Sequence, residues 1–245
     1  MSAQYDGIAE QYRRSTESPL REYVEAYTLL NLVGDVGGKS VLDLACGEGF
    51  YTRRFKSLGA ERVVGVDLSS AMIRLAEARE RENPLGLEYV CADVQDLGSV
   101  GEFDLVVAGY LLHYATTEQE MLRMCANIAN HLPAGGRFVT LNENPEQAAE
   151  QYAGYAQYGF NKTVEKPRGD GSKITYWMVA GHELFNFHAY FFGRDTYERV
   201  LRGAGFRELT WHELVLDAAG IEILGAEYFQ EYLVNPPIIG LECRV

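Results

Sequence analysis

The sequence contains no apolar run long enough to cross a membrane and no long run of basic residues. A membrane-spanning helix needs about 20 consecutive, mostly apolar residues, and no stretch approaches that length. Lysine and arginine total 22 against 35 aspartates and glutamates, giving a formal net charge of −13. The longest basic runs are Arg13-Arg14 and Arg53-Arg54. Because nucleic-acid binding requires clustered cations, we expect neither a membrane nor a nucleic acid as a partner.

Cysteine is also scarce, and the four cysteines are not spaced for a metal. Cys46, Cys91, Cys125 and Cys243 form no CxxC pair, whereas zinc sites need tighter clustering. We therefore predict no metal site and four buried free thiols, as in a reducing cytoplasm. The polar N-terminal segment "MSAQYDGIAEQY" has no signal-peptide core, which also favours a cytoplasmic protein.

The first 145 residues alternate between apolar, strand-like segments and amphipathic, helix-like segments. Continuous apolar strands joined by helices indicate a parallel sheet that is covered on both faces. Because crossover connections are right-handed, we predict an α/β fold with a doubly wound sheet. The expected strands are 40–46, 62–69, 87–93, 103–112 and 137–144, and the expected helices are 51–59, 71–82 and 117–132.

The composition changes after residue 144, where aromatic residues become frequent. The alternating segments 173–181 and 184–192 predict a hairpin, and 194–206 predicts a helix. The segments 207–216 and 236–245 predict two more strands, antiparallel because we expect only short or irregular structure beside them. We predict one domain over 1–245, divided into an N-terminal helical lid (1–38), a parallel sheet (39–144), an aromatic-rich cap insertion (145–193) and a C-terminal helix with antiparallel strands (194–245).

The first expected strand ends in a glycine loop, "VLDLACGEGF" (41–50). Gly47 and Gly49 form the G-x-G of a dinucleotide fingerprint, but its third glycine is absent. Asp43 at the strand end and Glu48 in the loop would repel a pyrophosphate. A ligand with an ammonium group and no phosphate would instead be favoured. An NAD-dependent oxidoreductase is therefore the alternative that this loop disfavours.

The pattern Asp43-x-Ala45-x-Gly47-x-Gly49 resembles motif I of the class I S-adenosylmethionine-dependent methyltransferases. Ala45 stands where the family usually has its first glycine. The resemblance extends through the whole expected parallel sheet, including "FDLVVAGYLLHY" at the fourth strand. It implies a Rossmann-like, seven-stranded sheet and S-adenosyl-L-methionine as the cofactor.

The resemblance also assigns residues to the parts of the cofactor. It implies that Asp67 accepts hydrogen bonds from the ribose hydroxyls and that Asp93 accepts one from the adenine amino group. Neither residue alone identifies a methyltransferase. Rossmann dehydrogenases bind ribose through an acidic residue in the same way, and Asp93 could be a helix cap. The other implied contacts are Leu68, Met72 and Val94 around the adenosine, with Ala108 and Gly109 beside the methionine part.

Tyrosines and histidines are the candidates for the acceptor side of the site. The segment "YDGIAEQY" resembles the N-terminal lid of small-molecule methyltransferases, in which Tyr5 and Tyr12 would close over the methionine end. Tyr110 would face the transferable methyl group. His113 and His188 are candidates for a base or a hydrogen-bond donor. The alternatives are helix-packing tyrosines and structural imidazoles.

The chain also contains Asn235-Pro236-Pro237, which resembles a motif of amino-methyltransferases that act on adenine or glutamine. That motif belongs directly after the fourth strand, so here we predict a turn into an edge strand. The N-terminal segment, the cap and "NPPIIGLECR" also resemble toxoflavin (azapteridine) type small-molecule N-methyltransferases. The resemblance implies methyl transfer to a nitrogen or oxygen of a planar heterocycle by a monomer or dimer. A protein methyltransferase and a non-catalytic cofactor-binding module remain alternatives.

Overall fold

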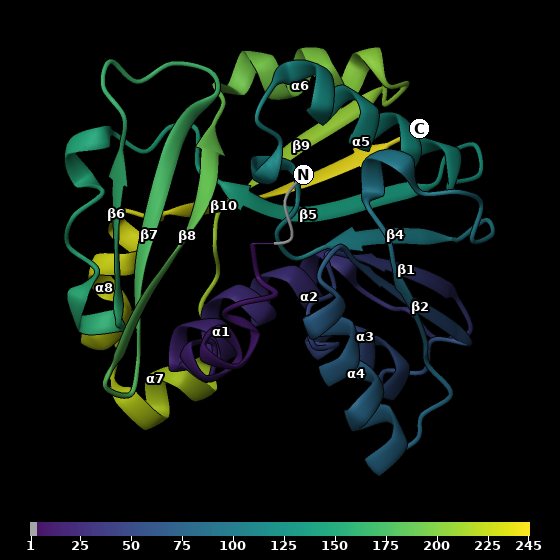
Figure 1. The fold of residues 1–245 in the computed structure, drawn as a ribbon, viewed down its shortest axis with the longest axis horizontal. Helices are drawn as coiled ribbons and strands as arrows, with labels where there is room; N and C mark the ends of the chain where they lie inside the picture. Colours follow the sequence, from purple (N-terminus) through teal and green to yellow (C-terminus); the bar gives the residue numbers. More distant parts are fainter. Residues whose placement is uncertain (1–3) are drawn as a thin grey trace.

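The computed structural model describes residues 4–245 and contains two β-sheets (Figure 1). The larger one, sheet A, has the strand order β3-β2-β1-β4-β5-β10-β9. Strands β1 to β5 are mutually parallel, and β10 runs antiparallel to both of its neighbours. This confirms the predicted α/β class and the doubly wound, seven-stranded sheet. The strands are β1 Ser40–Leu44, β2 Arg62–Asp67, β3 Glu88–Cys91, β4 Leu105–Ala108, β5 Arg137–Glu143, β9 Glu208–His212 and β10 Ile238–Arg244.

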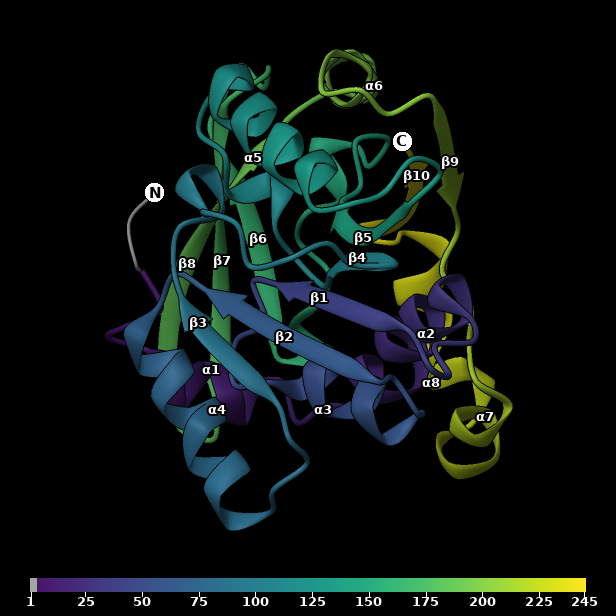
Figure 2. The same ribbon diagram turned by 90° about the vertical axis from the view of Figure 1, so that its right-hand side faces the viewer.

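Helices cover both faces of sheet A, with α5 and α6 on one face and α2, α3 and α4 on the other (Figure 2). Side chains alternate along β1: Val41 packs towards α2 and α3, and Leu42 packs towards α5. The buried strands are apolar on both faces for this reason. The helices are α2 Tyr27–Val33, α3 Phe50–Ser57, α4 Ser70–Glu82, α5 Glu118–Asn130 and α6 Arg194–Gly203.

The C-terminal part of sheet A confirms that its last two strands, β9 and β10, pair antiparallel and corrects one other prediction. Because β5 and β9 both pair antiparallel with β10, β9 runs in the same direction as β5, and only β10 is reversed. Strand β10 also lies inside the sheet, so Asn235-Pro236-Pro237 leads into an interior strand and not into an edge strand. The reason is a pair of helices that the sequence did not predict, α7 Ala218–Leu224 and α8 Ala226–Val234, which connect β9 to β10.

Sheet B is antiparallel, with the order β6-β7-β8, and stands beside sheet A (Figure 1). Its hairpin, β7 Ser172–Ala180 and β8 Glu183–Phe191, confirms the predicted pairing. The third strand, β6 Phe160–Val164, was not predicted. Its central residue, Lys162, is almost fully buried, whereas a lysine in a short segment usually indicates exposed chain.

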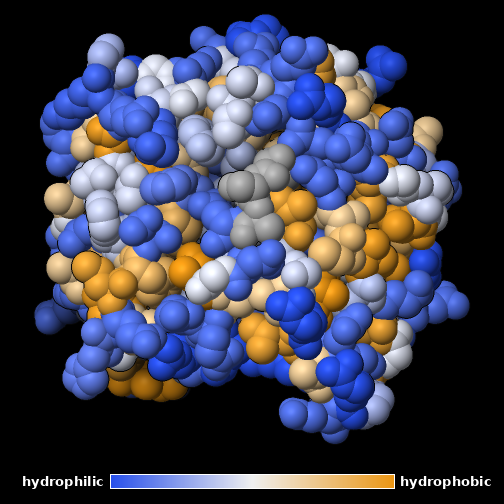
Figure 3. Space-filling model, viewed as in Figure 1, coloured by the Kyte–Doolittle hydropathy of each residue, from blue (hydrophilic) through white to orange (hydrophobic). Residues whose placement is uncertain are grey.

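The N-terminal segment lies between sheet B and the helices of sheet A (Figure 1). It contains α1 Ala9–Ser15 and the π-helix η1 Arg21–Ala26, which continues directly into α2. The Gln4 side chain exchanges two hydrogen bonds of 2.9 Å with the backbone of His188. The Asp6 carboxylate accepts a hydrogen bond of 2.6 Å from the Ser69 hydroxyl. Residues 4–15 are thus attached to sheet B and to the start of α4. Apolar side chains gather beside them on this face (Figure 3).

None of the helices within residues 4–245 is long and apolar enough to span a membrane. The same part of the chain contains no group of three or more histidine, cysteine or acidic side chains that could hold a metal ion. Three cysteines are buried, as predicted, but Cys91 is exposed. It ends β3, which is one of the two edge strands of sheet A, so fewer neighbours cover it.

Candidate functional site

Three cavities lie in a row where the parallel strands β1, β2 and β4 end. We call the middle one, of about 470 Å³, the loop cavity because Ala45 and Gly47 line it. The outer cavity, of about 840 Å³, is lined by Leu68, Ala92 and Val94. The aromatic cavity, of about 710 Å³, lies on the side of sheet B. The loop cavity shares Tyr5, Ala45, Asp67 and Tyr114 with the outer cavity, and Tyr12, Arg21, Tyr110 and Tyr114 with the aromatic cavity.

Asp67, the last residue of β2, lies between the loop and outer cavities. Its two carboxylate oxygens accept hydrogen bonds of 2.8 Å from the backbone N–H groups of Gly47 and Ser69. Burial raises its pKa, and the two N–H groups partly oppose that rise. Ser69 in turn caps α4 by accepting a hydrogen bond from the Met72 N–H group. The carboxylate therefore joins the glycine loop to the start of α4.

The glycine loop contains three residues with positive φ, and only two of them line a cavity. Gly49 (φ 83°) lines none within the described structure, and a Cβ there would lie 2.3 Å from the Tyr89 hydroxyl. Packing under the loop therefore requires that glycine. Ala45 has φ 53°, a left-handed conformation that strains a residue with a side chain. Its methyl group faces the loop and outer cavities.

We predict that Ala45→Gly stabilises the protein by about 0.5–1 kcal/mol. The left-handed conformation costs alanine about 1–2 kcal/mol, and the greater freedom of glycine in the unfolded chain offsets about 0.4–1 kcal/mol of the gain. The melting temperature should rise by about 1–4 °C. Ala76→Gly, inside α4, is the control and should lower it. A lower melting temperature for Ala45→Gly would contradict the strained loop.

The Asp43 carboxylate lies under the loop and lines none of the three cavities in the part of the chain that the structure describes. It has no exposed surface. One oxygen accepts a hydrogen bond of 2.6 Å from the Thr52 hydroxyl, and the other has no partner among the described residues. Burial raises its pKa to about 7. The structure therefore separates Asp43 from direct contact with a ligand in the loop cavity.

Asp93 and Ala108, which the sequence also assigned to the cofactor, line none of the three cavities in the described structure. Asp93 caps a short 3₁₀ turn, where its carboxylate accepts a hydrogen bond of 2.8 Å from the Gln95 N–H group. A cap was the alternative, structural role that the sequence left open for Asp93. Ala108, the last residue of β4, is fully buried, whereas its neighbour Gly109 lines the loop cavity.

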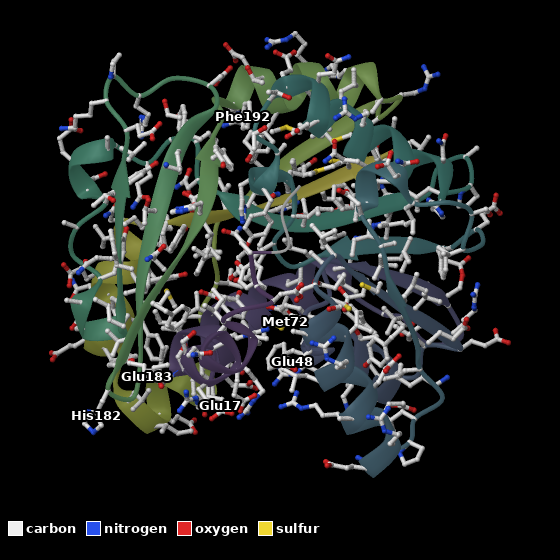
Figure 4. The ribbon with its side chains drawn as sticks, viewed as in Figure 1. Glu17, Glu48, Met72, His182, Glu183 and Phe192 are labelled. Carbon is white, nitrogen blue, oxygen red and sulfur yellow. The ribbon has the colours of Figure 1, made fainter. Side chains whose placement is uncertain are left out.

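The apolar candidates divide between two cavities. Leu68 and Val94 line the outer cavity together, as expected for one binding region. Met72 lines the loop cavity instead, with Gly109. Figure 4 shows Met72 near Glu48, between α1 and α4. From the sequence, Met72 was expected beside Leu68 and Val94 around the adenosine. In the structure it lies in a different cavity from these two residues.

The tyrosines and histidines proposed for the acceptor side also lie in different cavities. Tyr110 and Tyr12 stand at the boundary between the loop and aromatic cavities, and Tyr5 stands at the boundary between the loop and outer cavities. His113 lines the aromatic cavity. His188 lines only the outer cavity, where its Nδ1 lies 3.3 Å from the Thr175 hydroxyl. Of the two histidines, His113 alone is placed to touch a molecule in the aromatic cavity.

His113 is held in its neutral form. Burial lowers its pKa to about 4. The Nδ1 atom accepts a hydrogen bond of 3.3 Å from the Glu143 N–H group. Because one ring nitrogen accepts, the neutral imidazole carries its proton on Nε2. His113 is therefore suited to donate a hydrogen bond and not to act as a base.

We predict that His113 makes the protein less stable in mild acid. A folded-state pKa of about 4 lies below the ordinary value of 6.5, so the unfolded chain binds more protons between these values. Stability should therefore fall as the pH drops from about 6.5 to about 4, by up to about 3 kcal/mol. Urea unfolding of His113→Gln should show a flatter pH dependence. His182→Gln, which removes an exposed histidine at the β7–β8 turn (Figure 4), should retain the wild-type dependence. Parallel curves for wild type and His113→Gln would contradict the buried neutral imidazole.

Two charged residues on the π-helix η1 line the site but were not predicted as site residues from the sequence. The Arg21 guanidinium lies 4.1 Å above the Phe50 ring, and its buried Nε has no hydrogen-bond partner in the described structure. The Glu25 carboxylate accepts hydrogen bonds from Tyr110 (2.5 Å) and Tyr232 (2.8 Å). The spacing of four residues places both on one helix face. That spacing was the available signal, although it did not reveal what the face would meet.

A buried ion pair supports the wall of the aromatic cavity. Lys162 of β6 donates a hydrogen bond of 2.8 Å to Glu143 of β5, and both side chains are almost fully buried. Tyr176, a wall residue of the cavity, also donates to Glu143. The Lys162 ammonium lies 4.1 Å above the Tyr152 ring. This pair joins sheet A to sheet B behind the cavity.

Comparisons with known proteins identify the family and the fold. Residues 41–136 match a family model described as a methyltransferase domain. The ubiquinone biosynthesis O-methyltransferase of Coxiella burnetii is 30% identical over 176 residues, covering 67% of this chain and 69% of that protein. The N-demethylindolmycin N-methyltransferase of Streptomyces griseus is 25% identical over 211 residues, covering 84% and 87%. The fold matches an S-adenosylmethionine-dependent methyltransferase structure from Mesorhizobium loti, with a TM-score of 0.65 and 22% identity over 94% of this chain and 100% of that one.

Proposed function

The chain belongs to the class I S-adenosylmethionine-dependent methyltransferases, and we propose that it methylates a nitrogen or oxygen atom of a small planar molecule in the aromatic cavity. This family membership excludes the NAD-dependent oxidoreductase alternative. The observation that carries the proposal is the shared wall between the loop and aromatic cavities. Because Tyr12, Arg21, Tyr110 and Tyr114 line both, a cofactor and an acceptor would meet there.

The residues around the loop cavity fit S-adenosyl-L-methionine, which carries a carboxylate, an ammonium group and a sulfonium. Two buried polar atoms near this cavity lack partners among the described residues: Nε of Arg21 and Oδ1 of Asp43. A buried charge without a partner costs folding free energy unless a ligand of opposite charge binds. Their charges match those of the cofactor carboxylate and ammonium. Arg21 would bind the carboxylate, and Asp43 would favour the ammonium from below the loop.

The remaining cofactor contacts follow the order of the cavities. Asp67 would accept hydrogen bonds from the ribose, and Leu68 and Val94 would hold the adenine in the outer cavity. Tyr5 would cover the passage between the outer and loop cavities. Residues 4–15 close the site in this proposal, since Gln4 attaches them to sheet B and Asp6 attaches them to the start of α4.

The protein's own contribution to methyl transfer is alignment and exclusion of water. When bound, the cofactor supplies a methyl group on a positively charged sulfur, which is already activated. Tyr12, Tyr110 and Tyr114 would enclose the point of transfer. His113, as a neutral donor, would orient a polar atom of the acceptor.

The walls of the aromatic cavity support a flat acceptor. The rings of Tyr176 and Phe187 are stacked, with centroids 4.9 Å apart and planes at 7°. Phe160 stacks on Tyr176 from the next strand, with centroids 6.1 Å apart. Flat rings pack well against such surfaces, so the proposed acceptor is a planar heterocycle, azapteridine-type compounds included. Two relatives, named for ubiquinone biosynthesis and for N-demethylindolmycin, support a small acceptor methylated at oxygen or nitrogen.

Isotope transfer tests this proposal. The purified protein is incubated with tritium-labelled S-adenosylmethionine and bacterial extract separated into small-molecule and protein fractions. We expect labelled product from the small-molecule fraction. Label in the protein fraction alone would instead support a protein methyltransferase, and tight cofactor binding without label in any fraction would support a non-catalytic module.

We predict that binding of S-adenosylhomocysteine at pH 7 releases a proton from Asp43. Its pKa of about 7 leaves roughly half of the free protein protonated there, and a nearby ammonium group would lower that pKa. Calorimetric titration in phosphate and in Tris should therefore give different binding heats. Asp43→Asn should remove the difference. Equal heats for the unmodified protein in both buffers would count against a role for Asp43 near the ammonium.

A further inference from the structure

Glu25 is a half-buried carboxylate in the wall of the aromatic cavity, and no cation among residues 4–245 pairs with it. It accepts hydrogen bonds only from the hydroxyls of Tyr110 and Tyr232 among the described residues. Two deeper acidic side chains nearby have cation partners: Glu143 pairs with Lys162, and Glu48 pairs with Arg79. Asp43 and Asp67 have none among the described residues, but neither lines the aromatic cavity. Within the described structure, Glu25 is therefore the acidic side chain that faces the aromatic cavity without a cation partner.

The surroundings of Glu25 suit a positively charged group. Aromatic rings line the cavity around it, including those of Tyr114, Tyr176 and Phe187. Cations are attracted by the faces of aromatic rings as well as by a carboxylate. The two tyrosine hydrogen bonds fix the carboxylate but leave it further acceptor positions, since a carboxylate has about four.

Arg21 lies one helical turn from Glu25, but within the described structure the two side chains do not form an ion pair. Its guanidinium stacks on Phe50. Arg21 lines both the loop and aromatic cavities, whereas Glu25 lines the aromatic cavity and not the loop cavity. In the proposed function Arg21 binds the cofactor carboxylate, which leaves the charge of Glu25 to the acceptor. Electrostatic complementarity then assigns the acceptor a positive charge.

We propose that the acceptor is a primary or secondary amine on a flat, apolar body, and that Glu25 binds its nitrogen. This inference rests on the proposed function and selects nitrogen over oxygen. Tyr110, which donates to Glu25, also lines the loop cavity, so the bound nitrogen would lie near the point of methyl transfer.

The reaction balances without a further reactant. The bound ammonium ion first releases a proton to solvent, and the lone pair of the neutral amine forms the new N–C bond. The bond between the methyl carbon and sulfur breaks, and its electron pair remains on sulfur. The methylated product is again an ammonium ion, which Glu25 can hold.

Binding of matched probes to protein saturated with S-adenosylhomocysteine tests this proposal. One set is tryptamine, tryptophol and indole-3-propionate, and the other is phenethylamine, phenethyl alcohol and 3-phenylpropionate. In at least one set, calorimetry should show the amine binding at least tenfold more tightly than the alcohol. Failure of every amine to bind, or equal affinity for amine and alcohol, would overturn the proposal.

Substitutions then test whether Glu25 causes the preference for the amine over the alcohol. Glu25→Gln should weaken amine binding at least tenfold and leave the alcohol within about twofold. Glu22→Gln, an exposed carboxylate on the same helix, is the matched control and should change neither. An unchanged amine preference in Glu25→Gln would overturn the role of Glu25. Should that variant not fold, the comparison of amine with alcohol in the unmodified protein still decides. Absence of S-adenosylhomocysteine binding would reject the proposed cofactor site, whereas its binding without amine preference rejects only this inference.

Discussion

Replacement of Asp67 by alanine should weaken binding of S-adenosylhomocysteine at least a hundredfold. A hydrogen bond to a charged acceptor contributes about 1.5–3 kcal/mol, so the loss of two ribose hydrogen bonds costs about 3 kcal/mol or more. That corresponds to a factor above one hundred in the dissociation constant. The variant also frees the N–H groups of Gly47 and Ser69, which loosens the loop in the same direction. Calorimetric titration measures the change.

Asp96→Ala is the control for this experiment. Asp96 is an exposed carboxylate on the turn after β3 and lines no cavity within the described residues. Its replacement should leave the dissociation constant within about twofold. Melting curves of both variants establish that each is folded at the temperature of the titration. A folded Asp67→Ala protein with wild-type affinity would reject the proposed ribose site.

Replacement of Lys162 by methionine should destabilise the protein by about 3–5 kcal/mol. The substitution leaves the Glu143 carboxylate buried without its cation, and loss of one partner of a buried pair costs that much. The melting temperature should fall by about 6–20 °C. Urea unfolding at pH 7 gives the free energy directly.

Lys173→Met provides the matched comparison on the same sheet. Lys173 of β7 also pairs with a glutamate, Glu165, but both side chains are exposed. Its loss should cost less than about 1 kcal/mol. The double variant Lys162→Met, Glu143→Gln should recover part of the loss, because it leaves no buried charge unpaired. Equal effects of the two lysine substitutions would contradict the burial of the Lys162 pair.

The parallel part of the fold could be predicted because its signals are local. Continuous apolar strands such as 103–112 and the glycine loop after β1 each lie within about ten residues. The boundaries differ, since β4 spans only Leu105–Ala108, but the doubly wound parallel sheet and the cofactor class follow from such segments. Asp67 was assigned to the ribose by the family resemblance, from its place at the end of an apolar strand, and that role stays a prediction.

The aromatic cavity could not be predicted, because its charged residues come from distant parts of the chain. Glu25 lies on η1, and its partner Tyr232 lies on α8, which was not predicted as a helix. Nothing in the sequence near either residue indicates the other. Lys162 was equally hidden, since its burial depends on an ion pair with Glu143 across two sheets. Asp43 was recognised by its motif, but its depth below the loop depends on packing by Thr52.

The division of wall residues between the cavities bears on how acceptor specificity can evolve. Tyr12, Arg21, Tyr110 and Tyr114 line both the loop and aromatic cavities, so mutations there alter cofactor affinity and acceptor choice together. Other wall residues face the aromatic cavity and not the loop cavity, and they belong to sheet B, its flanking segment and α8: Tyr158, Phe160, Tyr176, Met178 and Tyr232. Drift or directed evolution confined to that second group can exchange one acceptor for another while the donor site is inherited unchanged.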